Sequence, residues 1–406
     1  SSRAVQRALI ENVAFRVIAH NQTPGYWSLN RFRTQHREAL GNLLTQTVKL
    51  AANLNLVNLG NVAMDGTKIK AHASKHKAKR YGRMNREEER LTEEIDVLLK
   101  RQVDAYLEAC DAQDALDDET FGVDGDGFSL PEELRDAQAR RKAIANAKRE
   151  LEARAVKKKR QEHESKREEA AEQGRRFTPR KRAKDIKPES RDQINFTDPE
   201  SRIMVRIGAF VQAFNAQVAV DVETHIVLAA QAGSDAADVN YLPSVLGEVV
   251  VNTGEAPKVV TADAGYYSQK ILEHVTSLGT EALIPPDKMR RREWRAQQGP
   301  RGRIPKNLST KDRMRRRLAT KEGKRSYLQR QTSVEPVFGN VKGARGLRQF
   351  LHRGMEKNHH LFRLDMVAHN VLKIVRHIQR AGYSRGPPGQ PMNLTTPANG
   401  LPPTPI

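Results

Sequence analysis

The sequence predicts a mixed α/β fold, in which a sheet is flanked by helices, preceded by a helical region and interrupted by a helical hairpin. Short apolar runs typical of strands alternate with segments in which apolar residues recur at helical spacing. Long charged stretches contain few apolar positions. Hydrophobic residues make up only 38% of the 406 residues, so we expect one solid core with long solvated segments.

Residues 1–58 are predicted to be helical. The chain is broken at Thr23-Pro24-Gly25, and Ser28 is a suitable N-cap for the helix that follows. A helix, a break and a basic helix are typical of a helix-turn-helix, but a small helical bundle with a solvated basic face has the same pattern. Both interpretations stay open. The DNA contacts expected from this region are Arg31, Arg33 and Arg37.

The main core is predicted to span residues 59–380. It begins with two short strands within 56–73, separated by a tight region at Asp65-Gly66. A charged helical hairpin interrupts the core at 84–190, because two seams of apolar residues at helical spacing flank an acidic segment that contains glycine. Residues 156–190 lack such a seam and are expected to form a solvated helix or a disordered linker.

The second half of the core is predicted to alternate strands and helices. A hairpin is expected at 210–231, a basic insert at 286–330 and a disordered tail at 385–406. The strand Lys258 to Asp263 has no polar alternation, so it should be central and buried on both faces. The remaining helices and strand are expected at Leu242 to Val251, Ser268 to Leu278, Glu281 to Pro285, Ser333 to about Phe350, and Leu361 to Arg380.

The formal net charge of +21 and the pI near 10.1 indicate a polyanionic partner. Nucleic acid is the leading candidate and a membrane surface is the alternative, although no apolar stretch is long enough to span a bilayer. A single cysteine, Cys110, excludes an intrachain disulfide framework and suits a reducing cytoplasm. The chain starts at Ser1 without a methionine, which is compatible with a missing N-terminal piece.

Asp65, Asp263 and Glu335 are the candidate catalytic and metal-binding residues. Two of them are expected at strand ends and the third at a helix start, near the positive end of the helix dipole. Carboxylates so placed could hold two Mg²⁺ ions about 4 Å apart for phosphoryl transfer. Asp263 is the expected bridging ligand. For either aspartate alone, a turn-forming role at a strand end is the simpler interpretation.

The helix expected from Ser333 carries one acid, then small and basic residues, at helical spacing. Such a stripe suits a helix laid beside a DNA backbone, while the alternative is an exposed salt-bridged face. The glycines lower helix propensity without benefit to a surface, which favours the first interpretation. The stripe comprises Glu335, Gly339, Lys342, Arg345, Gly346 and Gln349.

Five short sequence segments together resemble the DDE transposases of bacterial insertion sequences, and the resemblance runs from about Phe15 to Ile374. They are Val62 to Ser74, Thr197 to Met204, Phe214-Asn215-Ala216-Gln217, Thr261 to Tyr266, and Val334 to Gly339. The resemblance implies an RNase-H-like core in which Asp65, Asp263 and Glu335 form the metal-binding triad. A Tyr-Arg-Glu-Lys signature of the family is matched by Tyr327, Arg330, Glu335 and Lys342, with one residue more than usual between Arg330 and Glu335.

The resemblance further implies a Mg²⁺-dependent insertion-sequence transposase with two ions, for which Mn²⁺ can substitute. Its partners would be double-stranded DNA, as transposon terminal inverted repeats and as target, with a homodimer forming on DNA in the bacterial cytoplasm, at the nucleoid. The alternatives are a nuclease of the same fold without strand transfer, and an inactive DNA-binding protein derived from a transposase. Phosphate contacts are expected from Lys68, Lys70, Arg330, Lys342, Arg345 and Arg348.

Overall fold

The computed structural model describes residues 2–74, 77–114, 132–172, 175–179, 182, 185–206, 209–287, 299–300, 302, 305 and 308–381. The chain divides into two compact units. The first unit consists of 1–72 together with 203–406, and the second of 73–202. Each unit has its own hydrophobic cluster, and each is described by itself.

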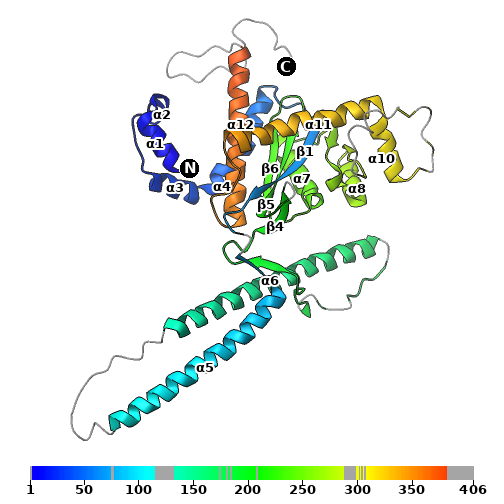
Figure 1. Cartoon of the computed structure of the whole chain (residues 1–406). Helices are drawn as coiled ribbons and strands as arrows, with labels where there is room; N and C mark the ends of the chain where they lie inside the picture. The colour runs from blue at the N-terminus through cyan, green and yellow to red at the C-terminus, as the bar shows by residue number, and fades with distance from the viewer. Residues whose placement is uncertain are drawn as a thin grey trace. The chain divides into compact units, whose positions relative to one another are not determined.

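The first unit is built on a mixed sheet with β1 (Val62–Lys70) at its centre (Figure 1). One neighbour, β5 (Ala209–Asp221), runs antiparallel to β1, and the other, β7 (Val259–Thr261), runs parallel to it. β8 (Glu281–Leu283) extends the parallel side, whereas β6 (Val227–Gly233) and β4 (Arg202–Arg206) pair on the side of β5. The predicted α/β class with a mixed, RNase-H-like sheet is confirmed.

β1 corrects one expectation from the sequence. The prediction placed two strands around a tight region at Asp65-Gly66, but β1 is continuous through both residues. Its residues Val62 to Lys70 pair without interruption with Asp221 to Ala213 of β5. Glycine suits this position inside the strand because a side chain there would collide with the amide of Gln217. Asp65 therefore lies within a strand and not at its end.

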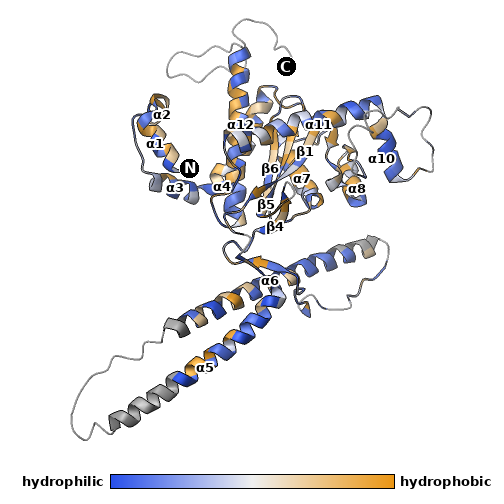
Figure 2. Cartoon of the chain, in the orientation of Figure 1, coloured by the Kyte–Doolittle hydropathy of each residue, from blue (hydrophilic) through white to orange (hydrophobic). Residues whose placement is uncertain are grey.

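Helices cover the sheet and complete its core. α7 (Leu242–Thr253) and α8 (Gln269–Ser277) confirm the predicted helices, and Ser268 caps α8 through its hydroxyl. α4 (Arg37–Asn53) and α12 (Met355–Ala381) pack against each other and against β6. Figure 2 shows hydrophobic colour on the strands and on α7, and hydrophilic colour over most of α10. The core unites Val48 and Ala51 of α4 with residues of the sheet, α7 and α8.

The N-terminal region is helical, as predicted, with different boundaries. It contains α1 (Ser2–Glu11), α2 (Val13–Ile18), α3 (Tyr26–Gln35) and then α4. α3 begins after Gly25, so Ser28 lies inside the helix and is not its N-cap. Thr47, Val48 and Ala51 are buried, because α4 is a structural part of the core. The helix that carries the predicted basic residues is thus divided at His36.

The helix that carries Glu335 begins earlier than predicted. α10 (Thr310–Ala319) is followed by α11 (Lys321–Gly339), which Thr320 caps through its hydroxyl. Glu335 is therefore in the second half of a helix, and Pro336 lies inside it. A π-helical turn (Asn340–Ala344) continues α11, and Gly346 with φ 70° ends the helical path. The expected helical stripe does not extend to Gly346 and Gln349, and residues 321–330 of the predicted basic insert are helical.

The second unit is dominated by the predicted helical hairpin. α5 (Tyr81–Asp114) and α6 (Glu132–Glu172) pack on each other, and β2 (Ala78–Arg80) pairs antiparallel with β3 (Gln193–Asn195). The predicted seam is confirmed at Leu91 and Ile95, which are buried against Ile144 and Leu151. α6 is helical to Glu172, so the first part of 156–190 is a helix and not a linker.

The predicted disordered tail at 385–406 lies outside the described residues. Within the described part of the chain, none of the helices combines the length and the apolar composition that crossing a membrane requires.

Candidate active site on the central strands

The register between β1 and β7 brings Asp65 and Asp263 together. Ala63 is the partner of Thr261 in this parallel pair. Two residues further along each strand direction come Asp65 and Asp263, and neighbouring strands are about 4.8 Å apart. Burial is the largest cause that raises the pKa of Asp65, and the charge of Asp263 adds to this rise. Two acids 198 positions apart in the chain (263 − 65) thus share one edge of the sheet.

Asp65 is held by a neighbouring amide and by a cation. Its Oδ1 accepts a hydrogen bond of 2.8 Å from the backbone N–H of Gly66. Its Oδ2 pairs at 2.6 Å with a guanidinium nitrogen of Arg330 on α11. Burial raises the pKa of Asp65, while the positive charge of Arg330 opposes that rise. Arg330 therefore keeps a desolvated carboxylate closer to its ionised form.

Asp263 lies at the start of a short turn. It is the N-cap of a 3₁₀ helix (Ala264–Tyr266), where its Oδ1 accepts a 2.8 Å hydrogen bond from the N–H of Gly265. The predicted strand to Asp263 ends slightly earlier, at Thr261. A side chain at Gly265 would come within 3.0 Å of the Asp263 carboxylate, which explains the glycine in Asp-Ala-Gly.

A buried polar network lies beneath the two aspartates. Tyr266 is fully buried and donates its hydroxyl to Oε1 of Gln217 on β5. Burial, followed by the charges of Asp65, Asp238 and Asp263, raises the pKa of Tyr266, so the phenol stays protonated as a donor. The amide of Gln217 in turn donates to Asn215 Oδ1 at 2.9 Å and to Asp238 Oδ1 at 2.8 Å.

Asp238 is a site residue that sequence reasoning missed. It opens a 3₁₀ helix (Asp238–Tyr241), and its Oδ1 accepts from Lys68 Nζ at 2.8 Å, from Asn215 at 2.7 Å and from Gln217 at 2.8 Å. Its two oxygens also lie 3.0 Å from the Cβ position of Gly66 and 3.6 Å from that of Gly265. The signal was available, since Asn215 and Gln217 alternate on one face of a strand in the word Phe214 to Gln217.

Glu335 is in the second half of α11, beyond Arg330. Arg330, Ser333, Val334 and Val337 are buried and form the face of α11 that packs on the sheet, whereas Glu335 is exposed. Ser333 donates to the Val222 carbonyl and is not a helix cap. Among the described residues, no three His, Cys, Asp or Glu side chains form a group that could hold a metal ion. The place of Glu335 in the metal-binding triad therefore stays a prediction.

Arg330 and Tyr327 belong to this site. The guanidinium of Arg330 lies over the ring of Tyr327 at 5.6 Å from its centroid. Burial raises the pKa of Tyr327, and the charge of Arg330 opposes this. Both residues are on the turn of α11 that faces Asp65, so the extra residue before Glu335 leaves their place at the site intact.

Apart from Arg330, the predicted phosphate-binding residues fall into two groups. In the first group, Lys342 contacts the Thr67 hydroxyl, and Arg348 and Lys70 are exposed. The other two are engaged within the protein: Lys68 is ion-paired with Asp238, and Arg345 donates to the Asp365 carbonyl at 2.7 Å and to Asn340 Oδ1 at 3.2 Å. Arg345 therefore fixes the loop after α11 to α12.

The N-terminal arginines are also distributed by the fold. Arg31 is exposed and stacks over Trp27, with its Cζ 5.5 Å from the ring centroid. Arg33 donates to His352 Nε2 at 2.9 Å, and Arg37 pairs with Glu356 at 2.9 Å. Two of the three thus face the loop before α12 and its first turn.

The donor set of the site fits a hard divalent cation. Mg²⁺ prefers oxygen ligands, and it is commonly bound by one or two carboxylates together with substrate phosphate oxygens. Asp65 and Asp263 supply two such carboxylates from neighbouring strands. The free edge of Asp238, whose second oxygen faces Gly265, adds negative potential next to them.

A mixed sheet that brings two aspartates together beside an arginine from a flanking helix is consistent with an RNase-H-like fold. The model of the family described as Transposase DDE domain matches residues 123–371. This match covers more than half of the chain, so the protein belongs to the transposase DDE domain family. The matched segment includes Asp263 and Glu335, and it begins after Asp65. Neither curated proteins nor solved structures gave a match.

Proposed function

We propose that this protein is an insertion-sequence transposase that cuts DNA at the ends of its element and joins the freed 3′-hydroxyl to target DNA. The observation that carries the proposal is the β1–β7 register, which supports a place for Asp65 beside Asp263, together with the ion pair of Arg330 with Asp65. Family membership supports transposase activity and a DNA substrate in general terms. The net charge of +21 supplies the electrostatic attraction that DNA binding needs.

Asp65 and Asp263 would bind the catalytic metal, with Glu335 completing the set from α11. When bound, two Mg²⁺ ions, or Mn²⁺ in their place, would activate the attacking oxygen and stabilise the leaving oxygen. The protein's own contribution is to hold the carboxylates in place. The Gly66 and Gly265 amides fix one oxygen of each aspartate.

Arg330 and Lys342 would hold the phosphate that is cut. Arg330 is buried, and its Nε has no hydrogen-bond partner among the residues described. A phosphate oxygen is a natural acceptor for a guanidinium, which binds such groups in a forked geometry. Lys342, next to Thr67 on the same strand as Asp65, would contact an adjacent phosphate. Lys70 and Arg348 would continue these contacts, and the active form on DNA would be a homodimer.

The test compares single carboxylate variants on one DNA. Asp65→Asn, Asp263→Asn and Glu335→Gln should each abolish Mg²⁺-dependent nicking of a duplex that carries the element's end, while gel-shift affinity persists. Glu255→Gln, at an exposed position after α7, is the matched control and should nick normally. Full nicking by the Glu335→Gln variant would remove that residue from the triad, and full nicking by either aspartate variant would overturn the proposed site.

A second candidate function is a DNA-binding protein that descends from a transposase without its chemistry. Among the described residues no three His, Cys, Asp or Glu side chains form a group that could hold a metal ion, which favours this candidate. Absence of nicking by the wild type in Mg²⁺ and in Mn²⁺, together with intact DNA binding, would select it. A nuclease without strand transfer would instead nick the duplex but fail to join a pre-cut end to target DNA.

A further inference from the structure

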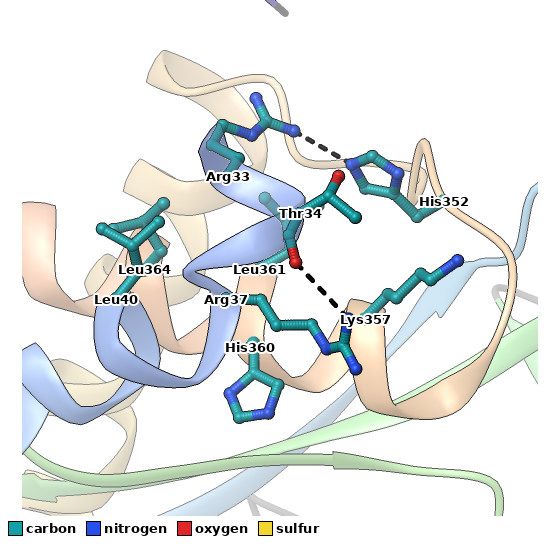
Figure 3. Close-up of a pocket in the computed structure, with 9 residues that line it drawn as sticks. All are labelled: Arg33, Thr34, Arg37, Leu40, His352, Lys357, His360, Leu361 and Leu364. Atoms are coloured by element: carbon teal, nitrogen blue, oxygen red, sulfur yellow. Dashed lines mark hydrogen bonds between the residues drawn. The ribbon is translucent and has the colours of Figure 1, made fainter. Parts of the chain in front are cut away.

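A pocket lies where the N-terminal helices meet the start of α12. Figure 3 shows its side chains converging from three segments of the chain. Arg33, Thr34, Arg37 and Leu40 come from the end of α3 and the start of α4, and His352 comes from the loop before α12. The remaining lining residues are on α12: Lys357, His360, Leu361 and Leu364.

The rim of the pocket is positively charged and only partly neutralised. In the described part of the chain, neither Arg33 nor Lys357 forms an ion pair with a carboxylate. Arg33 instead donates to His352, and Arg37 is the one that pairs with exposed Glu356. Burial, followed by the charges of Arg33 and Lys357, lowers the pKa of His352. Asp365 also lies near Arg33, and burial raises the pKa of Asp365 to about 6. A rim of this kind suits an anion that accepts hydrogen bonds.

A basic path connects this pocket with the two aspartates. The segment that follows α11 runs along β1, since Lys342 contacts Thr67 and the N–H of Phe350 donates to the Lys70 carbonyl at 2.8 Å. Lys70 and Gln349 form a parallel bridge, so both segments advance in the same direction. His352 lies two residues after Phe350. Exposed Lys70 and Arg348 lie on the way.

A DNA duplex laid along β1 would follow this path, and the length of the path would then correspond to a number of base pairs. A strand advances about 3.3 Å per residue, so the segment from Asp65 to His72 covers roughly 20 Å. Gln349 donates to the Ala71 carbonyl at 3.1 Å, so the segment that leads to His352 lies beside the end of this path. Successive base pairs of duplex DNA are about 3.4 Å apart, so roughly 20 Å corresponds to about six or seven base pairs.

We propose that the pocket between α3, α4 and α12 binds a backbone phosphate of the same DNA duplex, about six or seven base pairs from the bond that is cut. Arg33 and Lys357 would contact the phosphate oxygens, and Leu40, Leu361 and Leu364 would form the floor beneath the adjoining sugar. This inference rests on the proposed function only for the position of the cut. Binding of a phosphate at the pocket does not require the aspartates.

The first experiment measures the salt dependence of binding to a 30-base-pair duplex of arbitrary sequence, without metal. Loss of one phosphate contact should lower the slope of log affinity against log salt by about 0.9. Lys357→Glu should lower the slope by at least that amount, and Arg33→Gln should do the same. The matched control is Arg376→Glu, an exposed cation further along α12. Melting temperature is recorded for each variant, because Arg33 also bonds to His352.

The second experiment locates the contact. Ethylation of single phosphates on a duplex with the element's end should interfere with wild-type binding at a position six or seven base pairs from the nicked bond, and Lys357→Glu should abolish that interference alone. A slope unchanged from the wild type in the well-folded Lys357→Glu variant would overturn the proposal. Two other results would also overturn it. One is that ethylation interferes with binding at other phosphates but not at this position, and the other is that inorganic phosphate occupies the pocket and duplex DNA does not displace it. Loss of nicking in the aspartate variants with this contact intact separates the two proposals.

Discussion

The guanidinium of Arg330 lies 2.6 Å from the Asp65 carboxylate and joins α11 to the central strand. Both side chains are mostly buried, at 9% and 24% exposed, so solvent screens this pair less than a surface ion pair. The pair has an electrostatic role, because Arg330 opposes the rise that burial imposes on the pKa of Asp65. A carboxylate that must bind a cation has to be ionised at the working pH.

Arg330→Gln should therefore shift the pH dependence of the site. Without the positive charge, the pKa of Asp65 rises further, so a higher pH is needed to ionise the carboxylate. The acid limb of the pH profile for Mn²⁺ binding, measured by calorimetry, should move to higher pH. Nicking at the optimum should fall by about 100-fold or more, since a cation at the reacting phosphate is lost.

Arg325→Gln provides the control, because Arg325 is exposed on the same helix. It should leave both the metal-binding profile and nicking as in the wild type. An acid limb that stays in place in the Arg330→Gln variant would show that Arg330 does not set the ionisation of Asp65. A large fall in melting temperature would show that the pair is mainly structural.

Asp238→Asn should disturb the site without touching the predicted ligands. The asparagine keeps the shape but removes the charge that Lys68 and two amide donors share, so Lys68 would lose its ion pair. We expect metal affinity to fall by about tenfold, as is typical when a residue that orients ligands is changed. Isothermal titration with Mn²⁺ measures this, and circular dichroism checks the fold.

The comparison for that variant is Asp235→Asn. Asp235 is in the same turn, bonds to Asn240 and to the Ala237 amide, and has no described contact with Gln217. Its substitution should leave metal affinity unchanged. Equal effects from the two variants would mean that the turn as a whole, and not the Asp238 carboxylate, supports the site.

Two glycines should respond in opposite directions to alanine. Gly346 has φ 70° and ends the helical path after α11, so Gly346→Ala should destabilise the protein by about 1–2 kcal/mol. Gly247 lies inside α7 with no atom within 4 Å of its Cβ position, so Gly247→Ala should stabilise by about 0.5–1 kcal/mol. Urea denaturation measures both. A destabilised Gly247→Ala variant would contradict the helix-propensity argument.

The fold class was predictable from the sequence because its signals are local. Alternation of apolar and polar residues predicted the hairpin that contains β5, and the strand of β7 was predicted from its unbroken apolar run. The strand β8 and the helix α8 were also predicted at about their observed positions. The apolar seam of α5 and α6 was visible in the same way. The interpretation of Asp65-Gly66 as a turn was wrong, because tertiary packing against Gln217 places a glycine in the middle of a strand.

The candidate site was only partly predictable, because its parts meet through long-range pairing. The proximity of Asp65 and Asp263 depends on the β1–β7 register, which no local pattern specifies. Asp238 was missed because its partners, Lys68, Asn215 and Gln217, come from two other strands. The start of α11 was misplaced because Glu335-Pro336 is a typical first turn, whereas Thr320 caps the helix 15 residues before Glu335 (335 − 320).

Asp365 on α12 leads to a prediction about stability and pH. Burial raises its pKa from 3.8 to about 6, although Arg345 and Arg33 act in the opposite direction. A raised carboxyl pKa means that the folded state binds the proton more tightly than the unfolded chain. Proton binding by Asp365 therefore stabilises the folded state fully below pH 3.8, and this stabilisation is lost as the pH rises through about 6. At neutral pH the buried charge costs roughly 3 kcal/mol at most.

Asp365→Asn should remove this cost, since the neutral amide resembles the protonated acid. The Arg345 bond to the residue should persist, because it is made to the backbone carbonyl. At pH 7.5 the variant should be more stable than the wild type by up to about 3 kcal/mol, and the difference should shrink to near zero at pH 4. Urea denaturation at a series of pH values gives the curve. Because His359 and His369, with pKa values lowered to about 4, affect both proteins equally, only the difference between the proteins is diagnostic. A stabilisation that is the same at pH 4 and pH 7.5 would assign the effect to packing and not to the buried charge.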